Sequence, residues 1–169
     1  DDLIENNLKR IKLLEQAAQN IYKEWFVNMR FPGYENTPIN EDTGLPEGWE
    51  EAFVNDYFEF ERGIEVGSKN YLNKKTNSTI PFLRVGSLGD RGDNIYTKIS
   101  LVKGKILKFN DLCISLDGSI GLVGYGLEGA YSTGLRKVSS KNGKYINGFI
   151  YVLLKSNEIQ DTIRAYARG

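Results

Sequence analysis

The sequence contains no histidine, a single cysteine and no long hydrophobic run, and each of these absences excludes a class of function. Without histidine, the chain lacks the commonest general base and cannot build Ser/His or Cys/His nucleophile pairs or most zinc sites. The lone Cys113 has no disulfide partner within the chain, and its neighbours Leu112 and Ile114 indicate a buried strand thiol. No stretch of about 18 apolar residues is available to span a membrane, and the N-terminus lacks the basic-then-apolar order of a secretory signal. We therefore expect a cytoplasmic protein that holds no metal and no cofactor.

The charges are unevenly distributed, although the formal net charge is zero. Residues 62–155 hold 15 Lys/Arg and 6 Asp/Glu, an excess of nine positive charges. A segment with this excess is suited to a polyanionic partner if its positive charges share one face, and is otherwise an ordinary solvated surface.

Catalytic motifs are missing from this basic region. A methyltransferase acting on a base amino group needs a glycine-rich loop after a strand to hold the methyl donor. The adenine-modifying class also needs an Asn/Asp-Pro-Pro-aromatic loop to bind the flipped base, and neither pattern is present. A metal-dependent nuclease needs clustered carboxylates, often close to a lysine, yet no Asp-x-Lys or Glu-x-Lys tripeptide is present. Asp111 and Asp117 are six residues apart on either side of a predicted strand, and this spacing indicates a turn residue and a loop residue. The glycine-rich stretch 118–124 lacks the Gly-Lys-Ser/Thr ending of a phosphate loop.

The first 30 residues have the periodicity of one long amphipathic helix. Apolar residues alternate at spacings of three and four, which is typical of a coiled-coil seam, and Pro32-Gly33 is expected to end the helix. So long an apolar stripe needs a partner surface to cover it. The residues predicted to contact that partner are Ile4, Ile11, Leu14, Ala18, Ile21, Tyr22, Trp25 and Phe26.

Beyond this helix, the pattern changes to short strands. Residues 31–48 contain three of the four prolines and predict a linker, and fifteen of the eighteen glycines follow residue 62, consistent with tight turns. After Ser156 the apolar spacing predicts a closing helix capped by Ser156 or Asn157. We expect an α+β fold with a helix over 1–30, a linker over 31–48 and a strand-rich domain over 49–169. The predicted strands are 58–60, 80–85, 106–109, 112–116, 121–125 and 149–154.

Several short motifs, in a fixed order, resemble a known family. They are Gln19-Asn20-Ile21-Tyr22-Lys23-Glu24-Trp25-Phe26-Val27, Leu45-Pro46-Glu47-Gly48-Trp49, Ile80-Pro81-Phe82-Leu83-Arg84-Val85-Gly86-Ser87-Leu88, Asp111-Leu112-Cys113-Ile114-Ser115 and Gly118-Ser119-Ile120-Gly121. Their order over residues 19–124 is similar to that of the specificity subunits of type I restriction-modification enzymes.

This resemblance implies a non-catalytic subunit that reads double-stranded DNA. It implies partner modification subunits, which carry the methyltransferase chemistry, and restriction subunits, which act as motor and nuclease. It also implies a recognition domain whose loops enter the major groove, joined to long antiparallel helices that set the distance between two half-sites. A full family member has two recognition domains and two such helices, whereas this chain has one of each. We therefore expect the C-terminal half or a half-subunit, whose helix pairs with the second recognition half or another copy of this chain.

Under this hypothesis, polar loop residues read base edges and nearby cations bind phosphates. The residues expected near base edges are Arg62, Lys69, Arg84, Ser87, Asp117, Ser119 and Thr133. Those expected at phosphates are Lys98, Lys103, Lys105, Arg136 and Lys137.

The alternative is a protein-interaction or assembly module without sequence-specific DNA readout. In that case the helical stripe carries the function, with Tyr22, Trp25 and Phe26 as interface residues, and the basic domain is structural.

Overall fold

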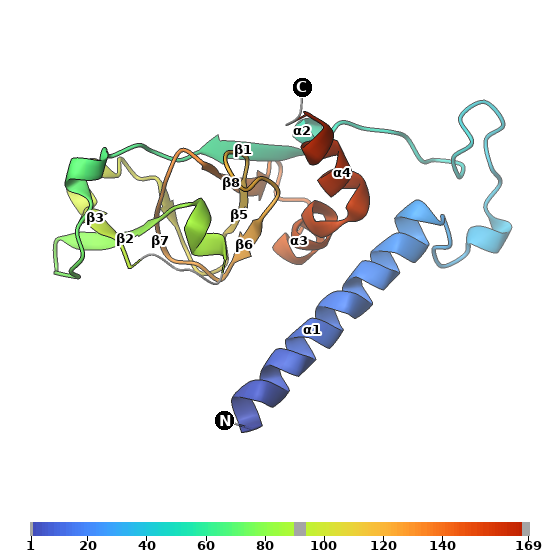
Figure 1. Ribbon diagram of the computed structural model, residues 1–169. Coiled ribbons are helices and arrows are strands. Elements are labelled where there is room, and N and C mark those ends of the chain that lie inside the picture. The colour runs from blue at the N-terminus through green and yellow to red at the C-terminus, as the bar shows by residue number, and fades with distance from the viewer. Residues whose placement is uncertain (1, 90–93, 167–169) are drawn as a thin grey trace. The chain divides into compact units, whose positions relative to one another are not determined.

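The computed structural model describes residues 2–89 and 94–166 and divides into two compact units (Figure 1). The N-terminal unit comprises Asp1–Phe53 and the C-terminal unit comprises Val54–Gly169. The last three residues of the predicted recognition domain lie outside the described residues.

The N-terminal unit begins with the predicted long helix. Helix α1 spans Asp2–Tyr22 and continues as one π-helical stretch, η1, over Lys23–Val27. The helix ends before Pro32, and the chain leaves it through Met29, whose φ is 57°. An ion pair between Lys9 Nζ and Glu5 Oε1, 2.7 Å apart and one helical turn from each other, supports the exposed surface of α1.

The rest of the N-terminal unit is irregular but internally ordered. A 3-10 turn, η2, spans Tyr34–Asn36, and Ile39 and Pro46 form an isolated bridge that closes a loop. The Trp49 ring stacks on Phe31 at 4.9 Å and lies 5.8 Å from Phe26, between ring centroids. Trp49 therefore packs against both Phe26 near the end of the long helix and Phe31, the first residue of the predicted linker.

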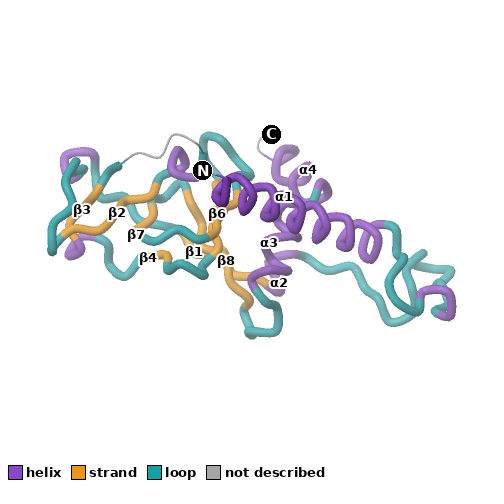
Figure 2. Tube along the Cα trace, turned by 90° about the horizontal axis from the view of Figure 1, so that it is seen from below, coloured by secondary structure: helices purple, strands orange, loops and turns teal. Residues whose placement is uncertain are grey.

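The C-terminal unit contains two four-stranded sheets (Figure 2). The first sheet has the order β1-β8-β5-β6 and is antiparallel throughout. The second sheet has the order β3-β2-β7-β4, in which the β2–β7 pair is parallel. The strands are β1 Phe58–Arg62, β2 Thr79–Leu83, β3 Tyr96–Lys98, β4 Ile106–Leu107, β5 Leu112–Ser115, β6 Val123–Tyr125, β7 Gly129–Tyr131 and β8 Leu135–Ser140. Short 3-10 turns are η3 Ser68–Asn70, η4 Val85–Leu88 and η5 Ile99–Leu101.

Helices cover one end of the C-terminal unit. They are α2 Val54–Tyr57, α3 Asn147–Lys155 and α4 Asn157–Tyr166. Figures 1 and 2 both place β3 at the opposite end of this unit from α3 and α4. Side chains of α3 and α4 pack on Phe58, Ile114 and Val138 of the first sheet, which form the largest of three buried clusters. The cluster around Tyr131 contains residues of both sheets and joins them, and the cluster around Phe82 belongs to the second sheet and its flanking segments.

The predicted strand over 149–154 is wrong, because this segment is helix α3. Ile150 and Leu154 are the buried residues of α3, and their spacing of four places both on one helical face. A short, continuous apolar run has the same composition in a buried strand as in a buried helix, so its period does not distinguish them.

The other predicted elements agree with the structure to within a few residues. The α+β class, the long first helix and the closing helix are confirmed, and the remaining five predicted strands correspond to β1, β2, β4, β5 and β6. Strands β3, β7 and β8 were not predicted. Strand β7 consists of Gly129, Ala130 and Tyr131, all buried, and a segment with a glycine at one end has little β propensity of its own.

Candidate nucleic-acid interface

The predicted reading loops meet at the turn between β7 and β8, residues 132–135. Leu135 N donates to Ser132 O at 3.0 Å to close this turn. From the first sheet, Leu116 N donates to Gly134 O at 3.1 Å, and from the second, Ser132 N donates to Leu83 O at 2.9 Å. The loops that carry Asp117, Arg84 and Thr133 are therefore held together by backbone hydrogen bonds.

The segment that follows β1 joins the same turn. Gly63 N donates to Leu135 O at 3.3 Å and Ile64 N donates to Tyr131 O at 2.9 Å. A Cβ on residue 63 would lie only 2.2 Å from Ser132 O, so glycine is required for this close approach. Arg62, the last residue of β1, is thereby placed next to the predicted reading loops.

The β5–β6 loop presents Asp117 and Ser119 at an exposed tip. Buried Ser115 holds this loop closed: its hydroxyl donates to Ser119 O at 2.5 Å and accepts from Leu122 N at 2.9 Å. Helix α4 supports the far side of the loop, because Gln160 Nε2 donates to Gly121 O at 2.9 Å. The side chains of Asp117 and Ser119 consequently project from a loop whose backbone is fixed at both ends.

Arg84 and Ser87 occupy the turn after β2. Arg84 N donates to Ser87 Oγ at 3.0 Å, and Ser87 N donates back to Arg84 O at 2.9 Å. The Arg84 guanidinium lies 5.4 Å from the centre of the Tyr71 ring, a cation–π distance. Tyr71 thus orients a half-buried Arg84, a role that the sequence did not reveal.

Thr133 and Arg136 are linked within the β7–β8 turn. The guanidinium of Arg136 donates to the carbonyl oxygens of Thr133 and, at 3.1 Å, of Leu135. In the sheet register, Arg136 is directly opposite Arg62 of β1, so their side chains project from the same face. Two arginine side chains therefore leave neighbouring strands beside the turn.

Two of the lysines predicted to bind phosphates, Lys105 and Lys137, form ion pairs within the protein. Lys105 Nζ lies 2.7 Å from Glu61 Oε1, and Lys137 Nζ lies 2.7 Å from Asp111 Oδ2. The Tyr131 hydroxyl donates to the other Glu61 oxygen. These hydrogen bonds from Lys105 and Tyr131 lower the pKa of Glu61 below its usual 4.5. Burial, together with the Glu61 carboxylate, raises the pKa of the Tyr131 hydroxyl.

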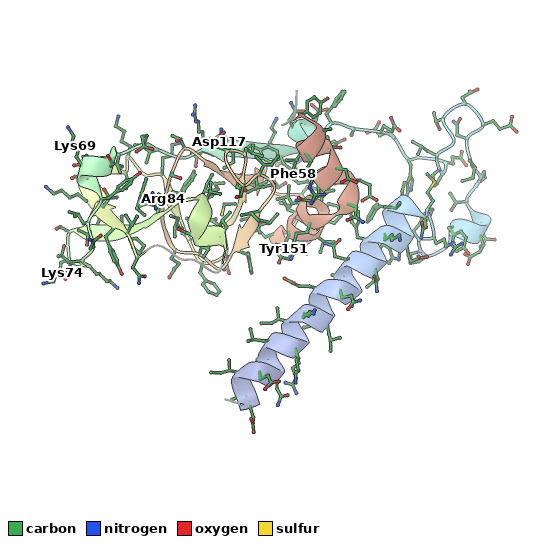
Figure 3. All side chains as sticks on the ribbon, in the orientation of Figure 1. Phe58, Lys69, Lys74, Arg84, Asp117 and Tyr151 are labelled. Carbon is green, nitrogen blue, oxygen red and sulfur yellow. The ribbon has the colours of Figure 1, made fainter. Side chains whose placement is uncertain are left out.

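A further set of exposed lysines lies around the second sheet. Residues 66–89 and 94–110 hold eight Lys/Arg and no Asp/Glu. The predicted residues Lys69, Lys98 and Lys103 are all exposed there, on η3, at the end of β3 and after η5. Within residues 2–89 and 94–166, none of these three makes an ion pair. Figure 3 shows Lys69 at the end of the unit near β2 and β3, with Arg84 between this end and the helices.

Sequence reasoning missed Lys74 and Lys75, two further exposed lysines in the loop before β2. They could have been recognised from the polar run Asn73-Lys74-Lys75-Thr76-Asn77-Ser78, which separates two apolar segments and therefore indicates an exposed loop. Figure 3 places Lys74 at the same end of the unit as Lys69.

The apolar side chains of α1 are exposed in the N-terminal unit. Leu14 is 71% exposed and Ile4 is 65% exposed, and no residue of α1 is buried. Ile11 and Ile21 are also exposed, whereas Ala18 is partly covered. Tyr22 and Phe26 already contact each other, at 5.1 Å between ring centroids, and Trp25 lies 6.5 Å from Phe26.

Residues 2–89 and 94–166 contain no group of three or more His, Cys, Asp or Glu arranged to hold a metal ion. Asp111 lies in a turn, where its carboxylate accepts from Lys108 N at 2.8 Å, and Asp117 lies on the exposed loop. Burial raises the pKa of the Cys113 thiol to about 12. None of the described helices is both long and apolar enough to span a membrane.

The fold is shared with solved specificity subunits of restriction systems. The HsdS subunit from Thermoanaerobacter tengcongensis superimposes with a TM-score of 0.55 and 16% identity over 96% of this chain and 39% of that chain. The type I restriction-modification S subunit from M. genitalium gives a TM-score of 0.54 and 15% identity over 95% of this chain and 40% of that chain. At these identities the likeness establishes the fold class, an α+β specificity-subunit fold.

Sequence comparison assigns the family. Residues 46–168 match the model of the type I restriction modification DNA specificity domain, and the chain belongs to this family. The specificity subunit of the type I restriction enzyme MjaIX from Methanocaldococcus jannaschii is 33% identical over 90 residues, which are 52% of this chain and 20% of the relative. The resemblance seen in the sequence motifs is thus confirmed, and the chain spans less than half of each of these relatives.

Proposed function

We propose that this chain reads a specific sequence in double-stranded DNA and directs partner subunits that act on it. The chain itself performs no chemistry in this scheme. Modification subunits supply the methyltransferase activity, and restriction subunits supply the motor and nuclease. The protein works in the cytoplasm, where its DNA substrate is located.

The convergence of polar loops at the β7–β8 turn carries this proposal. Base edges are recognised by side chains with directional hydrogen bonds, held on loops by a rigid scaffold. Arg62, Arg84, Asp117, Ser119 and Thr133 come from four separate segments that backbone hydrogen bonds tie to this turn. Because the chain belongs to the DNA specificity domain family, we propose that duplex DNA is the ligand of this surface.

The structure supports different roles for the predicted residues. Arg84 and Arg136 are held in place by protein contacts and are suited to bidentate recognition of guanine or of a phosphate. Ser87, whose hydroxyl accepts from Arg84 N, shapes the turn that carries Arg84. Lys105 and Lys137 would have to break an ion pair to reach DNA, so we assign them to the scaffold.

The exposed stripe of α1 supports the proposed assembly. Ile4, Ile11 and Leu14 present apolar surface at coiled-coil spacing, which a second helix would cover. We propose that this helix comes from the other recognition half or from another copy of the chain.

A segment exchange tests the reading function directly. Residues 62–133 would be replaced by the corresponding segment of a relative with a different target, and the full natural chain assembled with its modification subunits. Mapping of the methylated positions should then show a changed target sequence. An unchanged target, with modification activity retained, would show that these residues are not the reader and would favour the pure assembly module.

A further inference from the structure

The loop of residues 73–78 is a surface that the proposed reading function does not use. It lies at the end of the C-terminal unit near β3, as Lys74 in Figure 3 shows, and away from the β7–β8 turn where the reading loops meet. From this loop and its surroundings we propose a separate phosphate-binding site, made by Lys74 and Lys75 together with Lys98, that grips the DNA backbone without reading sequence. This inference rests on the proposed function, because the ligand is the same duplex.

The sheet register brings these three lysines together. Tyr96 of β3 pairs with Pro81 of β2 on one edge and forms an isolated bridge with Leu72 on the other. Thr79, the first residue of β2, pairs with Lys98. Residues 73–78 therefore connect the two segments, Leu72 and β2, that pair with opposite edges of β3. The loop that carries Lys74 and Lys75 consequently lies beside β3, which ends at Lys98.

Local hydrogen bonds hold the loop in shape. Thr76 N donates to Thr79 Oγ1 at 2.7 Å, and Thr79 N donates to Thr76 O at 3.2 Å. Ser78 O accepts from Ile99 N at 3.0 Å, which fastens the loop to the residue that follows Lys98. The two lysines are thus carried on an ordered turn, and less conformational entropy is lost when they bind.

The described segments around the loop, residues 66–89 and 94–110, carry only positive side-chain charges. Residues 66–89 contain no acidic residue, and Lys74, Lys75 and Lys98 make no ion pair within residues 2–89 and 94–166. Between these two segments of the sequence, residues 90–93 carry two Asp and one Arg, a net charge of −1. Glu65, the nearest acidic residue before the loop in the sequence, accepts from Gly67 N at 2.8 Å.

The residue types favour phosphate over bases. Lysine ammonium groups are compact point charges on flexible stems, suited to phosphate oxygens, whereas bidentate recognition of a base edge is the chemistry of arginine and the amides. Neutralising a phosphate releases a condensed counterion, so such a contact contributes affinity that depends on salt and not on sequence. The site would therefore hold the domain on DNA while the reading loops sample different sequences.

The salt dependence of binding tests this site. Duplex affinity of the full natural chain, assembled with its modification subunits, would be measured at several salt concentrations. One duplex carries the mapped target and the other a scrambled sequence of equal length. The Lys74→Gln/Lys75→Gln variant should reduce the slope of log K against log salt by about 1.8. This slope corresponds to a loss of affinity of up to about sixtyfold at 0.1 M relative to 1 M salt, equal for both duplexes.

A matched control removes two lysines elsewhere. Lys141 and Lys144 are exposed on the turn between β8 and α3, and the Lys141→Gln/Lys144→Gln variant should leave the slope unchanged. Thermal melting of the Lys74→Gln/Lys75→Gln variant should match that of the wild type, because both side chains are on the surface and make no ion pair within the described residues. The control variant loses the hydrogen bond from Lys141 Nζ to Asn55 O, so its slope is compared at a temperature below the melting transition of all three proteins.

Each other outcome overturns the inference. Unchanged slope in the Lys74/Lys75 variant, with the wild type still selective for its target, removes this site and leaves the reading function intact. A loss confined to the target duplex shows base reading by the loop. Weaker assembly with the modification subunits, at unchanged DNA affinity, shows a protein-binding surface. A wild type that binds neither duplex overturns both this site and the proposed function.

Discussion

At the scale of single residues, the position of Gly63 makes the tightest demand on side-chain size. Its Cα approaches the backbone of Tyr131 and Ser132 so closely that a Cβ would lie 2.4 Å and 2.2 Å from their carbonyl oxygens. Because the obstructing atoms are backbone atoms of a buried strand and turn, they cannot move aside without disturbing the junction of the two sheets.

The Gly63→Ala variant should therefore lose about 1 to 3 kcal/mol of unfolding free energy or more, the usual cost of forced overpacking. Urea denaturation monitored by circular dichroism measures it. Gly148→Ala is the control, since nothing lies within 4 Å of its Cβ position and it is in helix α3, where alanine is the better helix former. Equal stability of the two variants would contradict the proposed close approach.

Glu61 makes stability depend on pH. Hydrogen bonds from Lys105 and Tyr131 to the carboxylate lower its pKa in the folded protein, so it binds protons less readily than in the unfolded chain. Its contribution to stability is present above the usual pKa of 4.5 and is lost as the pH falls through the lower, folded-state value. Glu61 is partly exposed, so the contribution is of the order of 1 kcal/mol or less.

The Glu61→Gln variant tests this dependence, because its side chain does not titrate. At pH 7 the wild type should be the more stable of the two, and the difference should shrink as the pH is lowered below 4.5. Urea midpoints collected from pH 7 downward provide the comparison. A difference that stays constant over this range would show that Glu61 has the same pKa in the folded and unfolded chains.

At the scale of elements, helix α4 acts as a support for the β5–β6 loop. Gln160 Nε2 donates to Gly121 O at 2.9 Å and to Leu154 O at 2.7 Å, so one side chain ties the loop to both closing helices. Removing it leaves two carbonyl groups in partly buried surroundings without these hydrogen bonds.

The Gln160→Ala variant should lose about 1 to 3 kcal/mol of stability. It should also increase hydrogen exchange at the amides of residues 116–122, which a mass spectrometer can follow. Thr162→Ala, which removes an exposed bond to Glu158 O on the same helix, should cost less than about 0.5 kcal/mol and leave the exchange unchanged. If both variants behave alike, Gln160 does not support the loop.

Helix α1 is the second element whose role can be tested in isolation. Its exposed apolar stripe predicts a helical partner, and Leu14 is near the middle of that stripe. An aspartate at this position would be buried against apolar side chains in the assembly, at a cost of about 2 kcal/mol or more, equivalent to roughly thirtyfold weaker association.

Sedimentation of the Leu14→Asp variant should show this loss, and the melting temperature of the C-terminal unit should not change. Gln16→Asp introduces the same residue at an exposed position outside the seam, and should associate as the wild type does. Undiminished association of Leu14→Asp would remove α1 from the interface.

At the scale of the whole molecule, the division into two units predicts separable functions. All three buried clusters described in the structure are built from residues after Val54, so the C-terminal unit has its own hydrophobic core. A chain of residues 54–169 should therefore unfold in one cooperative transition, still bind DNA, and fail to assemble through α1. Scanning calorimetry measures the unfolding transition, and sedimentation measures both DNA binding and assembly. A fragment without a cooperative transition would show that the C-terminal unit needs the rest of the chain.

The sequence alone determined the family, the α+β class, the long helix and most of the strands. These depend on local periodicity, glycine and proline positions and short motifs, all of which can be recognised in the order of residues. Periodicity failed at 149–154 because a short apolar run suits a buried helix and a buried strand equally well.

Only the tertiary structure decided which polar residues lie together and which are already paired. In the sequence, Lys105 and Lys137 cannot be distinguished from Lys69 and Lys98, because all four are lysines of the same basic region. In the structure, Lys105 pairs with Glu61 and Lys137 with Asp111, whereas Lys69 and Lys98 are exposed to solvent. The partners in these ion pairs are 44 and 26 residues apart in the chain. Pairing over such separations follows from strand order and register, and these are set by long-range packing that no local pattern in the sequence records.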